Sequence, residues 1–139
     1  AQAVDWIPES LFQILTAAYR HRGFSFVRIL QRCPEFVGNM FEPWVHDPQR
    51  MLMLTHADGI RVSPALQKIY RNQLPHDPAD INRAREIASS EDPIPVGILY
   101  RNPEVPCYED LRGAGRLRTA DQVRGALDAE FDKFTVWPQ

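Results

Sequence analysis

The stretch PESLFQILTAAYRHRGFSFVRILQRC, residues 8–33, decides the class of fold. Residues 8–22 carry Leu11 and Leu15 on one face at helical spacing, which predicts an amphipathic helix. Pro8 fits the first turn of that helix, because the backbone N–H that proline lacks would have no partner there.

Gly23 is typical of the end of a helix, and the next segment, residues 24–32, reads FSFVRILQR. Both faces of that segment are largely apolar, as in a parallel strand covered by helices on both sides. A helix that passes through one glycine into such a strand is half of a βαβ unit. A lone αβ unit cannot close a sheet, so we expect the unit's first strand to lie before Ala1 and the chain to be the tail of a doubly wound α/β domain.

The rest of the chain alternates short strands and helices. We expect a hairpin of strands 51–56 and 60–62 around Ala57-Asp58-Gly59, helices at 64–72 and 78–90, and a buried strand at 96–100. Ser63-Pro64 and Asp77-Pro78 each combine a helix cap with a following proline. Thr119 and Gln122 have the spacing of a capping box, which opens a terminal amphipathic helix that we expect to dock on the body or on a partner.

Composition limits the classes of function. The 139 residues are 44% hydrophobic and 24% charged, with a formal net charge of −2 and no basic block, so nothing favours nucleic acid or a membrane surface as a partner. No apolar run reaches the roughly 18 residues of a membrane span, and no signal peptide is recognisable. Two cysteines make no disulfide framework, which favours a reduced, cytoplasmic setting.

No catalytic motif is present: the sequence has no phosphate-binding glycine loop, no nucleophile elbow and no HExxH. Cys33 stands at the predicted carboxyl end of a parallel strand, where open α/β sheets place their ligands, although the residues alone favour a packed thiol at this position. A zinc site made of Cys33, His46 and His56 can be imagined, but no ligand spacing supports it. We expect Cys107 to be an ordinary buried thiol.

Two blocks resemble the β subunits of 2-oxoacid:ferredoxin oxidoreductases. HRGFSFVRILQRCPEF, residues 21–36, is similar to the family's segment of helix, H-K-G-F-S-F-V strand and P-C-x-x-F. HDPADINRAREIASSEDPIPVGILYRNPEVPCYEDL, residues 76–111, is similar to the family's C-terminal region with its P-I-P-x-G-x-x-Y-R element. LTHADGIRV, residues 54–62, looks like the branch that uses 2-oxoglutarate rather than pyruvate.

The resemblance implies an enzyme that decarboxylates a 2-oxoacid oxidatively on coenzyme A and passes electrons to ferredoxin, using thiamine diphosphate, Mg²⁺ and a 4Fe-4S cluster. At Cys33 it implies the fourth thiolate ligand of that cluster. Arg32 stands where the family often has Pro. The family's G-D-G and C-x-x-C motifs match nothing in this chain, so we expect no catalytic or thiamine diphosphate-binding residue here and no cofactor bound by the isolated chain.

The same resemblance predicts the organisation of the chain. Residues 1–33 would be the last helix–strand unit of the thiamine diphosphate-binding domain, and residues 34–139 a C-terminal extension of loop, short strands and helices. The partners would be the α subunit, the remainder of the β subunit and ferredoxin. The alternatives are a non-catalytic α/β protein-interaction module that uses the aromatic loop between Phe36 and Trp44, and a small zinc-stabilised domain.

Overall fold

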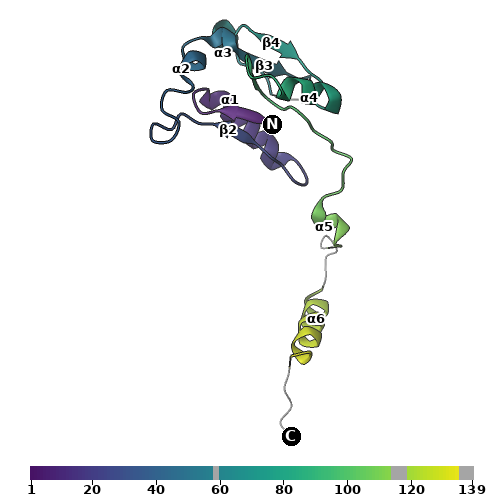
Figure 1. The fold of residues 1–139 in the computed structure, drawn as a ribbon. Coiled ribbons are helices and arrows are strands. Elements are labelled where there is room, and N and C mark those ends of the chain that lie inside the picture. The colour runs from purple at the N-terminus through teal and green to yellow at the C-terminus, as the bar shows by residue number, and fades with distance from the viewer. Residues whose placement is uncertain (58–59, 114–118, 135–139) are drawn as a thin grey trace. The chain divides into compact units, whose positions relative to one another are not determined.

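The structure, a computed structural model, describes residues 1–57, 60–113 and 119–134. The chain divides into two compact units, residues 1–105 and 106–139, and each is described by itself (Figure 1). Helices alternate with parallel strands in the first unit, so the predicted α/β class is confirmed.

The first unit opens with a complete βαβ unit. Strand β1 (Gln2–Val4) leads into helix α1 (Pro8–Arg20), which returns to strand β2 (Arg28–Leu30), and β1 and β2 pair in parallel. The prediction that the first strand lies before Ala1 is therefore wrong. Three residues are too few to show the alternation by which a strand is recognised in a sequence.

Strand β2 is shorter and more exposed than the sequence predicts. Of the expected strand, only Arg28–Leu30 pairs, and the side chains of Phe24, Phe26 and Ile29 are exposed. The apolar pattern predicted a strand covered on both faces, but in this chain β2 has β1 as its one neighbour among the described strands. The position of the strand was predicted correctly, whereas its burial was not.

A second sheet of three parallel strands has the order β4-β3-β5. Its strands are β3 (Met51–Thr55), β4 (Gln73–Pro75) and β5 (Ile94–Val96). Between them lie helices α3 (Pro64–Ile69) and α4 (Ile81–Ala88). The predicted hairpin is wrong: residues 60–62 form no strand, and β3 pairs instead with strands that follow later in the chain.

The segment between the two sheets includes the predicted aromatic loop between Phe36 and Trp44, and it contains helix α2 (Glu42–Val45) and a 3-10 turn (Pro48–Arg50). Two of its aromatic side chains pack inward, because Phe41 lies 5.6 Å from Trp6 and 6.3 Å from Trp44, measured between ring centroids. Phe36 is exposed, so only part of the aromatic loop packs within this chain.

Hydrogen bonds of Gln2 tie the two sheets together. The backbone N–H of Gln2 donates to the carbonyl of Gly97 at 3.0 Å, and the N–H of Gly97 donates back to Gln2 at 2.9 Å. The side chain of Gln2 is buried and donates to the carbonyl of Pro95 at 2.8 Å. Both sheets thereby share one core, made by Ala3, Val4, Ile7, Ile14, Met51, Met53, Ile60, Val62, Tyr70, Ile94, Val96 and Ile98.

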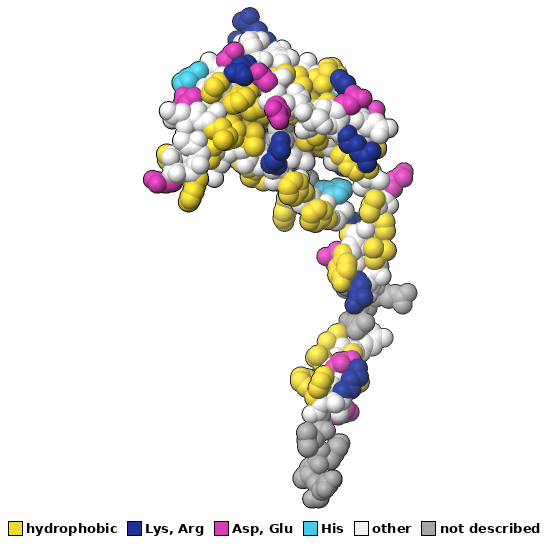
Figure 2. All heavy atoms as spheres, in the orientation of Figure 1, with side chains coloured by type: hydrophobic (Ala, Val, Ile, Leu, Met, Phe, Trp, Pro, Cys, Tyr) yellow, Lys and Arg dark blue, Asp and Glu magenta, His cyan; other side chains and the backbone are white. Residues whose placement is uncertain are grey.

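The second unit contains helix α5 (Tyr108–Leu111) and helix α6 (Ala120–Asp132). The capping box predicted at Thr119 and Gln122 is confirmed, with both of its hydrogen bonds present. The apolar face of α6 is exposed, and Figure 2 shows its hydrophobic side chains as a cluster on the visible surface of the helix. What this face docks on stays a prediction. None of the helices in the described part of the chain has the length and apolar character needed to cross a membrane.

Candidate functional site

The second sheet brings three residues to one edge. His56 directly follows β3, His76 directly follows β4, and Gly97 directly follows β5. Because the three strands are parallel, their carboxyl ends meet at the same edge, and this is where open α/β sheets place their ligands.

The two histidines at this edge form a chain of hydrogen bonds across the strand ends. His56 Nδ1 lies 2.7 Å from the carbonyl oxygen of His76, and His76 Nε2 lies 2.7 Å from the carbonyl oxygen of Leu99. A carbonyl can only accept, so each of these nitrogens carries the proton, which assigns the tautomer of both rings. His56 Nε2 and His76 Nδ1 are then acceptors, and both are buried without a partner among the described residues.

Burial lowers the pKa of His56 below its ordinary value of 6.5. Its hydrogen bond to the His76 carbonyl and the negative charge of Asp77 act in the opposite direction, whereas the positive charge of Arg101 adds to the lowering. His56 is therefore a neutral hydrogen-bonding group at pH 7 and not a cation. Together with His76 it fixes the strand ends in place at this edge.

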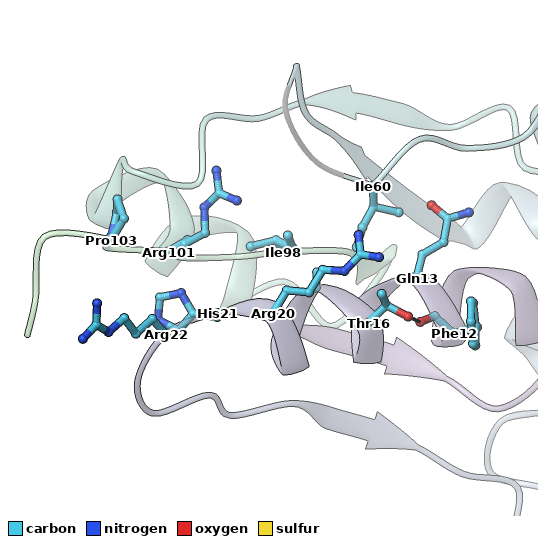
Figure 3. A pocket seen from close by; sticks show the side chains of 11 residues that line it. Phe12, Gln13, Thr16, Arg20, His21, Arg22, Ile60, Ile98, Arg101 and Pro103 are labelled. Carbon is cyan, nitrogen blue, oxygen red and sulfur yellow. Dashed lines mark hydrogen bonds between the residues drawn. The ribbon is translucent and has the colours of Figure 1, made fainter. Parts of the chain in front are cut away.

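A cleft of about 540 Å³ opens beside these strand ends (Figure 3). One wall is the C-terminal half of α1, and the opposite wall is the segment after β5, which carries Ile98, Arg101 and Pro103. Ile60, in the loop that leaves β3, closes the apolar part of the cleft. The volume is within the range of pockets that bind small molecules.

The cleft has a positive lining. Arg20, His21 and Arg22 reach it from the end of α1, and Arg101 reaches it from the segment after β5, whereas none of the described lining residues is acidic. Figure 3 shows the Arg20 side chain extending from α1 toward Ile60. The guanidinium groups of Arg20 and Arg101 form no ion pair with any described residue. The arrangement is suited to binding an anion.

Cys33, the predicted cluster ligand, is half-buried and follows the last residue of β2 by three positions. Its backbone carbonyl accepts from the N–H of Val37 at 2.9 Å, so the thiol stands at the start of a turn. Four thiolates are needed to hold a 4Fe-4S cluster, and Cys33 supplies one. The residues described here therefore do not make a cluster site by themselves, and ligation by Cys33 stays a prediction.

The other cysteine and the imagined zinc site are also placed by the structure. Cys107 is buried as predicted, and its Sγ lies 3.0 Å from Asp110 Oδ2 in a thiol–carboxylate hydrogen bond. Across the described ranges, no group of three or more His, Cys, Asp and Glu side chains is placed to hold a metal ion. Cys33, His46 and His56 therefore form no zinc site there.

Sequence patterns contain no direct signal for the cleft. Its cations come from segments about 80 residues apart, and neither segment contains a motif that binds anions. The one available indication of the cleft was Arg101. It is the last residue of the segment after β5 that resembles the family's P-I-P-x-G-x-x-Y-R element.

Fold and cleft together describe an α/β protein with a cleft beside the carboxyl ends of parallel strands. Comparison with known proteins narrows the class. A sequence model of the family described as the C-terminal part of the pyruvate ferredoxin oxidoreductase beta subunit matches residues 65–114. No solved structure gives a significant match.

Two curated proteins extend the similarity over most of the chain. The 2-oxoacid:ferredoxin oxidoreductase 2, subunit beta, of Aeropyrum pernix is 29% identical over 114 residues, which cover 79% of this chain and 33% of that protein. The 2-oxoacid:ferredoxin oxidoreductase subunit beta of a Sulfolobus species is 27% identical over 105 residues, which cover 72% of this chain and 30% of that protein. This chain thus spans about a third of the length of the curated relatives it matches.

Proposed function

We propose that this chain is the C-terminal part of the β subunit of a 2-oxoacid:ferredoxin oxidoreductase. The observation that carries the proposal is the agreement of two similarities: the family model covers residues 65–114, and the relatives, both β subunits, cover 72% and 79% of the chain. The α/β fold is consistent with this, because the segment that resembles the family's helix, strand and cysteine folds as α1, β2 and the turn at Cys33.

The complete enzyme would decarboxylate a 2-oxoacid oxidatively on coenzyme A and reduce ferredoxin. We infer that 2-oxoglutarate is the substrate from the resemblance at residues 54–62. Thiamine diphosphate and Mg²⁺ would be held by the part of the β subunit that this chain does not contain. When bound, thiamine diphosphate supplies the carbanion chemistry that decarboxylation requires.

Within this proposal Cys33 is one of four thiolates on a 4Fe-4S cluster, and Arg32 stands beside it in sequence. Arg32 Nε donates to Asp5 Oδ1 at 3.0 Å, and the backbone N–H of Arg32 donates to Asp5 Oδ2 at 3.2 Å. Asp5 directly follows β1, so this pair ties the turn that carries Cys33 to the carboxyl end of both strands. The fold would thereby hold the thiol in a fixed position for the cluster.

The decisive experiment replaces Cys33 by Ser in the complete enzyme. We expect the low-temperature paramagnetic signal of the cluster and the reduction of ferredoxin to be lost, while thiamine diphosphate is retained. Cys107→Ser is the matched control, because that thiol bonds to Asp110 in the other unit of the chain, and it should leave the signal intact. An unchanged signal in Cys33→Ser would refute the assignment of this ligand.

A second candidate function is a non-catalytic interaction module, which the exposure of Phe36 favours: 93% of that side chain is accessible. In that case Phe36→Ser would abolish binding to a partner subunit, whereas Cys33→Ser would change neither binding nor any redox signal. The two variants measured side by side separate the candidates.

A further inference from the structure

We propose that the outward side of α1 binds the same side of α1 in a second copy of this chain, as an antiparallel pair of helices. The proposal goes beyond the function proposed above and does not rest on it, because it uses only side chains of α1. Helix α1 packs on the core with one side, where Ser10 and Ile14 are buried. Its other side faces away from the core, and this outward side is the proposed interface.

Three large apolar side chains, the outer row, follow one another along the outward side of α1. They are Phe12, Leu15 and Tyr19, and 72%, 44% and 90% of these side chains are accessible. Their spacing of three and four residues places them in one line along a helix. Single exposed apolar residues are common on protein surfaces, whereas a contiguous apolar group marks an interaction surface.

Opposite charges stand at the two ends of the outer row. Glu9 lies in the first turn of α1 and Arg20 in the last, and both side chains are exposed. They lie on the same flank of the row, because 11 residues make about three full turns of a helix. Glu9 accepts hydrogen bonds from Gln13 and Ser63, and neither Glu9 nor Arg20 forms an ion pair with a described residue.

This pattern is self-complementary, which a contact between two identical surfaces requires. In an antiparallel pair, a two-fold axis that passes near Leu15 brings Phe12 of each copy to Tyr19 of the other. The same axis brings Glu9 of each copy to Arg20 of the other, so an ion pair forms at each end of the contact. A parallel pair would place Glu9 beside Glu9 and Arg20 beside Arg20, and these like charges would repel. The charges therefore select the antiparallel arrangement.

The apolar area of the outer row suits a weak, reversible dimer. Each Phe or Tyr ring buries roughly 150–250 Å² in an interface, so the four rings of two copies account for roughly 600–1,000 Å². The two copies of Leu15 bring this area toward the roughly 1,200 Å² at which specific interfaces begin. We therefore expect dimers with a Kd on the order of 10–100 μM.

Sedimentation equilibrium of the full chain at low salt, up to about 1 mM, tests the dimer. Leu15→Lys should weaken it about 10-fold or more, because it places two cations at the centre of the apolar contact. Ile69→Lys is the matched control: 51% of the Ile69 side chain is accessible, it lies on α3, and its replacement should leave the equilibrium unchanged. A chain that stays monomeric throughout would overturn the proposal. A dimer that Leu127→Lys disrupts and Leu15→Lys does not would place the contact on α6 and overturn it as well.

An exchange of charges tests the antiparallel orientation. Glu9→Arg and Arg20→Glu should each weaken their own dimer about 5-fold, because each variant brings like charges together at both ends of the contact. An equimolar mixture of the two variants should recover the affinity of the unsubstituted chain, since every altered charge then meets its opposite in the other copy. Circular dichroism checks that both variants keep their helices. A mixture that dimerises no more tightly than either variant alone would refute the antiparallel pair.

Discussion

Gly97 occupies a constrained position at the end of β5. Its φ is +143°, a conformation that L side chains rarely adopt, and a Cβ placed on it would lie 2.7 Å from Leu54 Cβ. It also forms both backbone hydrogen bonds to Gln2 that join the two sheets. Glycine at this position therefore lets β5 approach β3 closely while it bridges to β1.

Gly97→Ala should destabilise the chain by about 2–4 kcal/mol, through backbone strain and overpacking against Leu54. Chemical denaturation followed by circular dichroism measures the change. Gly125→Ala is the matched control: Gly125 lies in α6 with nothing within 4 Å of the added Cβ, so alanine should increase the stability of that helix by about 1 kcal/mol. A loss below about 1 kcal/mol in Gly97→Ala would contradict the close approach.

His56 should make the stability of the first unit depend on pH. Because burial lowers its pKa in the folded state below 6.5, the unfolded chain binds the proton more readily than the folded chain. The stability that neutral His56 contributes to the folded state is fully present above pH 6.5. It is lost as the pH falls from 6.5 toward the pKa of His56 in the folded chain. Between pH 7.5 and 5.5, we expect the midpoint of unfolding to fall less for His56→Gln than for the unsubstituted chain. An identical fall would show that another group is responsible for the pH dependence.

At the scale of elements, the helices were predicted well because their signals are local. Ser63 and Thr119 cap helices where the sequence placed the caps. The strand pairing was predicted poorly, since β3 pairs with segments about 20 and 40 residues further along the chain. A turn-like Ala57-Asp58-Gly59 favoured a hairpin, yet nothing local distinguishes a hairpin arm from a strand that pairs across a helix.

The cap of α4 gives a prediction about which of two aspartates, Asp77 or Asp80, caps the helix. The sequence favoured Asp77 as the cap, but Asp80 Oδ1 accepts from the N–H groups of Asn82 and Arg83, both at 3.0 Å. Asp77 Oδ1 accepts only from the N–H of Ala79, in the preceding turn. The cap lies three residues later than expected because the Asp77-Pro78 pair makes a turn first.

Asp80→Ala should therefore lower the free energy of unfolding by about 1 kcal/mol through the loss of the cap. Asp77→Ala should lower it by less than about 0.5 kcal/mol. Denaturant melts of both variants under identical conditions measure the difference. The reverse order of the two effects would show that Asp77 caps the helix after all.

At the scale of the whole molecule, the candidate site was the part least accessible to sequence analysis. Cys33 could be singled out because it lies beside a recognisable strand. The cleft could not, since it forms only when the end of α1 and the segment after β5 meet across two sheets. That meeting depends on the pairing of Gln2 with Gly97, two residues separated by most of the first unit and joined by no sequence pattern.

The division into two units predicts that residues 1–105 fold as a separate piece. The residues of the hydrophobic core all come from residues 1–105, so this segment buries the core without the rest of the chain. Expressed alone, residues 1–105 should melt cooperatively, within a few degrees of the full chain, as followed by the fluorescence of Trp6 and Trp44. Residues 1–93 are the control, because they lack β5 and with it the bridge to Gln2, and should not fold. If residues 1–105 also fail to melt cooperatively, then the first unit needs residues from outside its own range to complete its core.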